Sequence, residues 1–183
     1  MEEHLDRYRM YGLVPYNISP IQQGIQYGHA LQEYNNSFID HPEIRGFDEA
    51  EDRYKLEEQF NTWRLEDKTF IILNGGTSMT MEQHVETLKE AGIHIGVFRE
   101  PDLNNMVTGI VFIVPENVYK RDEWPDFKDW VIKRNPNNQI VKRLSVEDLK
   151  DLADGTTYKE WLDMVGGKKI AFLKEFTNQF KLA

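Results

Sequence analysis

The sequence predicts a layered α/β domain with a mixed four-stranded sheet, followed by a C-terminal helical extension. Four apolar runs of strand length alternate with helical segments up to about residue 115, and a short polar loop before the last run indicates an antiparallel strand pair. After Tyr119 the strand-like runs almost vanish and capped helices take over. We therefore place an α/β domain at residues 1–118 and a helical extension, packed on it, at residues 119–183.

The composition is that of a globular protein. The chain has 183 residues with 40% hydrophobic content, enough for one sizeable core. It contains no cysteine, which excludes disulfides, thiolate nucleophiles and zinc–thiolate sites. No apolar segment approaches the roughly 18 residues needed to span a bilayer, and residues 1–7 are too charged for a secretion signal. We expect a soluble, cytoplasmic protein without a membrane partner.

The formal charge of −9 disfavours a protein that coats nucleic acid, because phosphate contacts dominate such binding. It leaves room for local basic patches. The candidates are Lys133-Arg134 with Lys142-Arg143, and Lys168-Lys169 with Lys174 and Lys181. Basic side chains are also ordinary on a solvated surface, so both interpretations stay open.

The first strand is predicted at residues 10–16, and a helix follows from residue 21 to about residue 34. Ser19 is the expected N-cap of this helix and Pro20 its first residue. One face, expected to pack on the sheet, consists of Ile21, Gly24, Ile25, Gly28 and Leu31. A polar line beside it consists of Gln22, Gln26, His29 and Glu33. This polar line is either the solvated side of the helix or part of a functional site.

The next elements alternate as the fold class requires. We expect a helix within residues 47–63, a strand at 69–73, a helix at 80–91 and strands at 93–98 and 106–114. The helix at 80–91 has Thr80 and Gln83 at capping-box spacing and Gly92 beyond its end. Gly75-Gly76-Thr77-Ser78 before it is either a plain turn or a phosphate-binding loop. In the extension we expect helices at 126–134, 145–153, 157–165 and 168–182, with one strand-like run at 139–141.

The candidate chemistry involves no metal and no cofactor, since the five histidines show no metal-ligand spacing. His29, the loop Glu100-Pro101-Asp102 and Thr108 remain. In a layered domain the first helix and a late loop can meet at one rim of the sheet. An imidazole, a carboxylate and a hydroxyl that meet there are able to position and activate a water molecule.

Several short motifs follow one another along the chain: the Ser/Pro turn, Gln26-Tyr27-Gly28-His29-Ala30, Trp63, Gly92-Ile93, and Glu100-Pro101-Asp102-Leu103 leading to Thr108-Gly109-Ile110. In this order they resemble the archaeal and eukaryotic type of peptidyl-tRNA hydrolase, over about residues 10–114. The resemblance implies a three-layer α/β/α fold with a mixed four-stranded sheet. It also implies metal-independent hydrolysis of the ester that links a peptide to the 3′ ribose of tRNA.

Carried over to this chain, the family's motif residues fall on Gln26, His29, Asp102 and Thr108. We therefore expect His29, Asp102 and Thr108 to be catalytic, and Gln22, Gln26 and Asn17 to bind substrate. Three features depart from the family: its favoured lysine is replaced by Gln22, the connection at residues 35–67 is long, and the helical extension from Tyr119 has no counterpart. A glutamine donates a neutral hydrogen bond but cannot neutralise a phosphate or an oxyanion.

Two functions therefore stay open. The first is an esterase acting on the tRNA 3′ end with its attached peptide, in which basic residues of the extension replace the missing phosphate contacts. The second is a non-catalytic member of the same fold that binds a protein, through the former active-site cleft or the helical extension, or a small ligand. The lost lysine and the negative charge favour the second function, and the retained His29, Asp102 and Thr108 favour the first. Either function is compatible with a homodimer.

Overall fold

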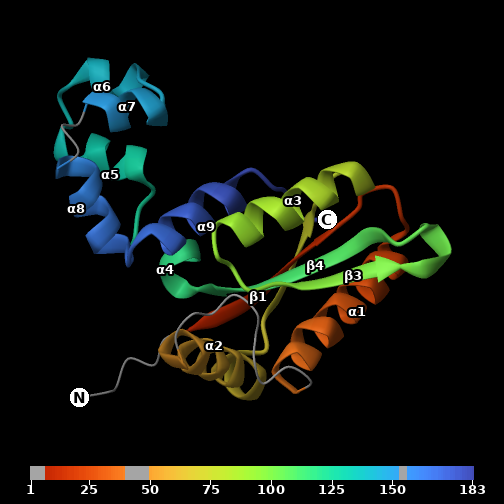
Figure 1. The fold of residues 1–183 in the computed structure, drawn as a ribbon. Helices are drawn as coiled ribbons and strands as arrows, with labels where there is room; N and C mark the ends of the chain where they lie inside the picture. Colours follow the sequence, from red (N-terminus) through yellow and green to blue (C-terminus); the bar gives the residue numbers. More distant parts are fainter. Residues whose placement is uncertain (1–6, 40–49, 153–155) are drawn as a thin grey trace. The chain divides into compact units, whose positions relative to one another are not determined.

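Four strands form one mixed sheet in the order β2-β1-β4-β3 (Figure 1). The strands are β1 (Tyr8–Val14), β2 (Phe70–Asn74), β3 (Gly96–Glu100) and β4 (Met106–Pro115). Strand β1 runs parallel to β2 and antiparallel to β4, and β3 is antiparallel to β4. The mixed sheet and the antiparallel β3–β4 pair are both confirmed.

The computed structural model describes residues 7–39, 50–152 and 156–183, which form two compact units. The α/β unit consists of residues 1–115 and 180–183, and the helical unit of residues 116–179. The last four residues thus return to the α/β unit, whereas the sequence analysis assigned them to the extension. No helix in the described part of the chain is long and apolar enough to cross a membrane.

Helices cover both faces of the sheet in the α/β unit (Figure 1). Helix α1 (Pro20–Ile39) packs on one face against β3 and β4. Helix α2 (Ala50–Thr62) and the π-helical turn η1 (Trp63–Asp67) contribute Phe60 and Trp63 to the same core. Helix α3 (Ser78–Glu90) packs on β4 from the other face. Strand β4 is accordingly buried from Val107 to Val114, as expected of a strand covered on both faces.

The buried face of α1 differs from the expected one. Tyr27, Ala30 and Tyr34 enter the core, whereas Ile21 and Ile25 are 78% and 51% exposed. The helix has two sets of apolar residues at helical spacing, one with Ile21 and Ile25 and one with Tyr27 and Tyr34. The set with the two tyrosines faces the core, because its large rings bury more apolar area. The Tyr27 hydroxyl also donates to the Met10 carbonyl at 2.9 Å, which removes the cost of burying it.

The starts of α1 and α3 are set by local hydrogen bonds. Ser19 caps α1 as expected: its backbone N–H donates to Gln22 Oε1 at 3.0 Å, and the Gln22 N–H donates to Ser19 Oγ at 3.3 Å. Helix α3 starts earlier than expected, because Thr77 and Thr80 form the capping box in place of Thr80 and Gln83. Gly76, with a φ of +88°, makes the turn before it.

The helical unit contains the helices α4 (Glu116–Tyr119), α5 (Phe127–Arg134), α6 (Gln139–Arg143), α7 (Val146–Leu152), α8 (Thr156–Val165) and α9 (Lys168–Asn178). The strand-like run at 139–141 is a short helix instead, because the Asn138 side chain accepts from the N–H groups of Ile140 and Val141. Six buried residues form a core within this unit: Phe127, Val131, Leu149, Trp161, Val165 and Ala171.

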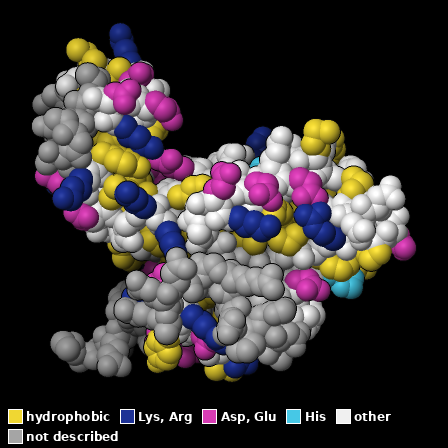
Figure 2. Space-filling view, in the orientation of Figure 1, with side chains coloured by type: hydrophobic (Ala, Val, Ile, Leu, Met, Phe, Trp, Pro, Cys, Tyr) yellow, Lys and Arg dark blue, Asp and Glu magenta, His cyan; other side chains and the backbone are white. Residues whose placement is uncertain are grey.

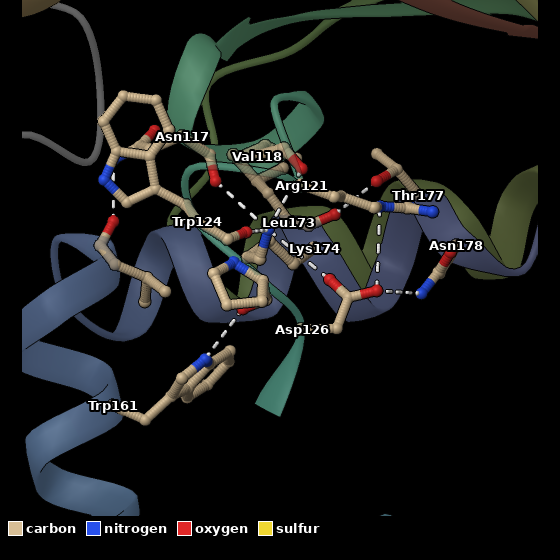
Figure 3. A network of polar contacts seen from close by, with 12 residues as sticks. Asn117, Val118, Arg121, Trp124, Asp126, Trp161, Leu173, Lys174, Thr177 and Asn178 are labelled. Carbon is tan, nitrogen blue, oxygen red and sulfur yellow. Dashed lines mark hydrogen bonds and ion pairs between the residues drawn. The ribbon is translucent and has the colours of Figure 1, made fainter. Parts of the chain in front are cut away.

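A buried lysine joins separate segments of the helical unit (Figure 3). Lys174 on α9 is 1% exposed, and its ammonium group donates to the backbone carbonyls of Asn117, Val118 and Trp124 at 3.2, 3.2 and 2.7 Å. Asp126 Oδ1 lies 3.4 Å from the same nitrogen. Burial lowers the pKa of Lys174, and Asp126 opposes that shift. These contacts use all three ammonium hydrogens, so Lys174 is a structural residue.

Helix α9 ends at Asn178, four residues earlier than expected, and the chain then pairs with the edge of β2. Leu182 forms an antiparallel bridge with Leu73. The Asn74 N–H donates to the Lys181 carbonyl at 2.9 Å, and the Ala183 N–H donates to the Ile72 carbonyl at 3.0 Å. An extended segment that satisfies the backbone of an edge strand gains more hydrogen bonds there than in a fraying helix end.

Candidate functional site

The side chain of Gln26 connects α1 to β3 and β4 at one rim of the sheet. Its Nε2 donates to Glu100 Oε2 at 2.9 Å, and its Oε1 accepts from Thr108 Oγ1 at 2.7 Å. Thr108 is 2% exposed. Because the amide has a donor end and an acceptor end, these two bonds determine its orientation.

Thr108 reaches Gln26 because of a β-bulge. Phe98 pairs with Gly109 and Arg99 with Val107, so Thr108 is the extra residue of β4 at this point. Gly109, Val111 and Ile113 alternate toward α1, so strict alternation would turn Thr108 to the opposite face of the sheet. The bulge instead directs the hydroxyl to α1.

Two glycines bring α1 close enough for these contacts. A Cβ atom at Gly109 would lie 2.4 Å from the Gln26 carbonyl oxygen, and one at Gly96 would lie 2.3 Å from the Ala30 carbonyl oxygen. Any larger residue at either position would collide with the helix backbone. These are the glycines that allow close approach, whereas Gly24 and Gly28 on α1 have no neighbour within 4 Å.

The loop between β3 and β4 is braced on its outer side. Arg99 binds Glu82 of α3 through both terminal nitrogens, at 2.6 and 2.9 Å, and also donates to the Asn105 carbonyl at 3.2 Å. The Arg99 side chain keeps the pKa of Glu82 below its usual range. Asn104 and Asn105 have φ values of +54° and +58°, which asparagine tolerates better than most residues. The bracing holds Glu100 beside Gln26.

The remaining expected site residues lie at the surface. His29, one turn after Gln26, is exposed, and its ring stacks on Phe98 with centroids 4.4 Å apart. Asp102 is exposed in the 3₁₀ turn η2 (Pro101–Leu103). Gln22 takes part in the cap of α1, and Asn17 is exposed in the turn before it.

The structure therefore brings Gln26 and Thr108 into direct contact, and places His29 on the same helix. Within the described residues, no hydrogen bond or ion pair joins His29 to Asp102 or to Thr108. The sequence analysis named Glu100 within the candidate loop but assigned the carboxylate role to Asp102. The signal that identifies Glu100 is its direct bond to Gln26, which no local pattern reveals.

Two further histidines in the α/β unit lie within its packing. His94 Nε2 is 2.8 Å from Ser37 Oγ, and burial lowers the pKa of His94 to about 4. His84 Nε2 is 3.2 Å from the Gly75 carbonyl oxygen, and burial lowers the pKa of His84 as well. His29 is thus the exposed imidazole beside the Gln26 network. The described residues contain no group of three His, Asp or Glu side chains placed to hold a metal ion.

The charge of the chain is divided unevenly between the units. The α/β unit contains 10 basic and 19 acidic residues, and the helical unit 12 of each. Figure 2 shows acidic side chains along α3 with Lys or Arg side chains beside them; Glu82 and Glu86 of this helix pair with Arg99 and Lys89. The net negative charge of the α/β unit offers little attraction to phosphates.

No family model matches the chain, and no curated protein matches it.

Proposed function

We propose that this chain is a metal-independent ester hydrolase of the peptidyl-tRNA hydrolase type, acting at the rim formed by α1 and the β3–β4 loop. The observation that carries the proposal is the Gln26 network, in which a helix amide is oriented by Thr108 and Glu100. Two residues that the family resemblance names thus contact each other across 82 positions of sequence. Packing alone does not require a polar contact of this kind.

In the proposed mechanism His29 accepts a proton from a water molecule that attacks the ester carbonyl carbon. The carbonyl oxygen becomes an oxyanion, which is supported by amide N–H donors. Gln22 is suited to this role, because its Oε1 accepts from Ser19 and leaves the NH2 group to donate outward. When the C–O bond breaks, the ribose oxygen takes the proton from His29. Asp102, at the rim, orients the imidazole or the water.

The Gln26 network contributes positioning. Thr108 is buried and its proton is directed at Gln26, so Thr108 acts on the substrate through Gln26 and Glu100. A locked network keeps its groups in place during the reaction, which lowers the cost of reorganisation.

The test is release of peptide from purified N-acetyl-aminoacyl-tRNA. We expect turnover by the wild type and a loss of about 100-fold or more in His29→Ala and Asp102→Ala. Gln32→Ala is the matched control, since Gln32 lies on the same helix and binds only Asn36 among the described residues. No turnover by well-folded wild-type protein, or turnover that survives both substitutions, would contradict the proposal.

A second candidate, a binding module for a protein or small ligand, is favoured by one observation. Ile21 and Ile25 present exposed apolar side chains on α1 next to the polar line. Failure of peptide release with a folded protein would make this the leading candidate.

A further inference from the structure

Basic residues strongly outnumber acidic ones in the segment at residues 133–143 of the helical unit. It contains Lys133, Arg134, Lys142 and Arg143, and the longer stretch 130–146 contains no aspartate or glutamate. All of its residues except Val141 are exposed. A local excess of four positive charges therefore lies on a chain whose formal charge is −9.

The fold turns these basic side chains outward. Lys133 and Arg134 are in the last turn of α5, and Lys142 and Arg143 in the last turn of α6. The apolar residues around them face inward: Val131, Val141 and Leu144 all belong to the core of the helical unit. Helices α5 and α6 pack on each other, so the two basic pairs belong to one surface.

Three of the four basic side chains are not neutralised. No carboxylate in the described part of the chain forms an ion pair with Lys133, Lys142 or Arg143. Arg134 binds Glu160 at 2.6 Å, and its guanidinium lies 4.0 Å from the centre of the Trp130 ring.

Some basic residues elsewhere in the unit are paired with acids, among them Lys120 with Glu116, Lys150 with Glu175, and Lys174 with Asp126. The 133–143 surface therefore keeps positive charge that is available to a partner.

The residues between the two basic pairs are amides. Asn135, Asn137, Asn138 and Gln139 are exposed. Asn135 lies at the end of α5, where its side chain donates to the Val131 carbonyl, and Asn138 caps the start of α6. Amide side chains, like those of lysine and arginine, are common donors to phosphate and sugar oxygens in nucleic-acid complexes.

We propose that the surface formed by residues 133–143 binds the phosphate backbone of RNA, specifically the body of the tRNA substrate. This inference rests on the proposed function. It supplies the phosphate contacts that Gln22, in place of the family lysine, cannot make. The hydrolytic site and the RNA-binding surface then belong to different units of one chain.

The test is binding of fluorescently labelled, deacylated tRNA to the full-length protein, followed by fluorescence anisotropy over a range of KCl concentrations. The test variant is Lys133→Gln/Lys142→Gln/Arg143→Gln. The control, Lys159→Gln/Lys168→Gln/Lys169→Gln, removes the same charge from exposed positions of the same unit. The test variant should bind about tenfold more weakly or worse, and its slope of log affinity against log salt should fall by about 2–3. The control should bind within about twofold of the wild type.

Thermal unfolding of both variants separates binding from stability, since cations in the last turn also favour a helix. Equal affinity of the two variants for tRNA would overturn the inference. So would wild-type affinity for polyglutamate, or for vesicles rich in phosphatidylserine, equal to that for tRNA.

Deacylated tRNA has no ester, so this measurement does not depend on hydrolysis. If the wild type releases no peptide but the test variant loses tRNA binding, only the proposed function fails. If the wild type releases peptide and the test variant has an unchanged KM, only the RNA surface fails.

Discussion

Replacing Gly109 by alanine tests whether the close approach of α1 to β4 builds the candidate site. The new Cβ would lie 2.4 Å from the Gln26 carbonyl oxygen and 3.0 Å from the Ala30 Cβ. A carbon and an oxygen approach to about 3.3 Å at the closest, so α1 must move by roughly 0.9 Å. The obstacle is backbone, so no side-chain rotation relieves it.

That displacement has two costs. Overpacking of this kind costs about 1–3 kcal/mol. The 2.7 Å bond from Thr108 to Gln26 would lengthen to about 3.6 Å, too long for a hydrogen bond, and leave a buried hydroxyl without a partner. The unpaired hydroxyl adds about 1–3 kcal/mol. The two costs sum to about 2–6 kcal/mol. The lower entropy of the unfolded alanine chain returns about 0.4–1 kcal/mol, so we expect a net loss of about 1–5 kcal/mol.

The assay is urea unfolding followed by far-ultraviolet circular dichroism, together with peptide release by the folded variant. Gly24→Ala is the matched control, because a Cβ atom at Gly24 on α1 would meet nothing within 4 Å outside its own helix backbone. Alanine there should stabilise the helix by about 0.5–1 kcal/mol. Stability and peptide release that Gly109→Ala leaves at wild-type level would refute the reasoning. A loss in Gly24→Ala as large as that in Gly109→Ala would show that the close contact is not the cause.

Three further predictions concern Lys174, Thr108 and His94. Lys174→Met should lower the free energy of unfolding by about 3–5 kcal/mol, because three carbonyls lose their ammonium donor and Asp126 keeps only Arg121 and Asn178 as partners among the described residues. Urea unfolding followed by tryptophan fluorescence measures this loss, since Trp124, Trp130 and Trp161 belong to the helical unit. Thr108→Val should lower the free energy of unfolding by about 1–2 kcal/mol, because the hydrogen bond to Gln26 is lost. It should also lower kcat more than it raises KM. A change in KM alone would argue for direct contact between Thr108 and the substrate. Burial lowers the pKa of His94 to about 4, so His94 binds a proton at a higher pH in the unfolded chain than in the folded one. The free energy of unfolding should therefore decline as the pH falls from about 6.5 to 4. His94→Gln should flatten that decline, and an unchanged pH dependence would contradict it.

The local features of the chain could be predicted because their causes are local. The first helix starts at Pro20 after a Ser19 cap, and the four apolar runs form four strands. Both features depend on residues that are only a few positions apart in the sequence. Errors occurred where two local solutions had similar strength. Thr77 and Thr80 compete as caps, and residues 139–141 suit either a strand or a short helix.

The sequence by itself determined the α/β class, the mixed sheet with its antiparallel β3–β4 pair, and the identity of Gln26, His29, Asp102 and Thr108 as candidates. Only the tertiary structure decided which stripe of α1 is buried and that Gln26 joins Thr108 to Glu100. The reason is that these outcomes depend on contacts between residues more than 60 positions apart in the sequence. A bulge at Thr108 turns its side chain to the face of the sheet that carries α1. The close packing of α1 on Gly96 and Gly109 determines which side of the helix is buried. No periodicity along the chain contains that information.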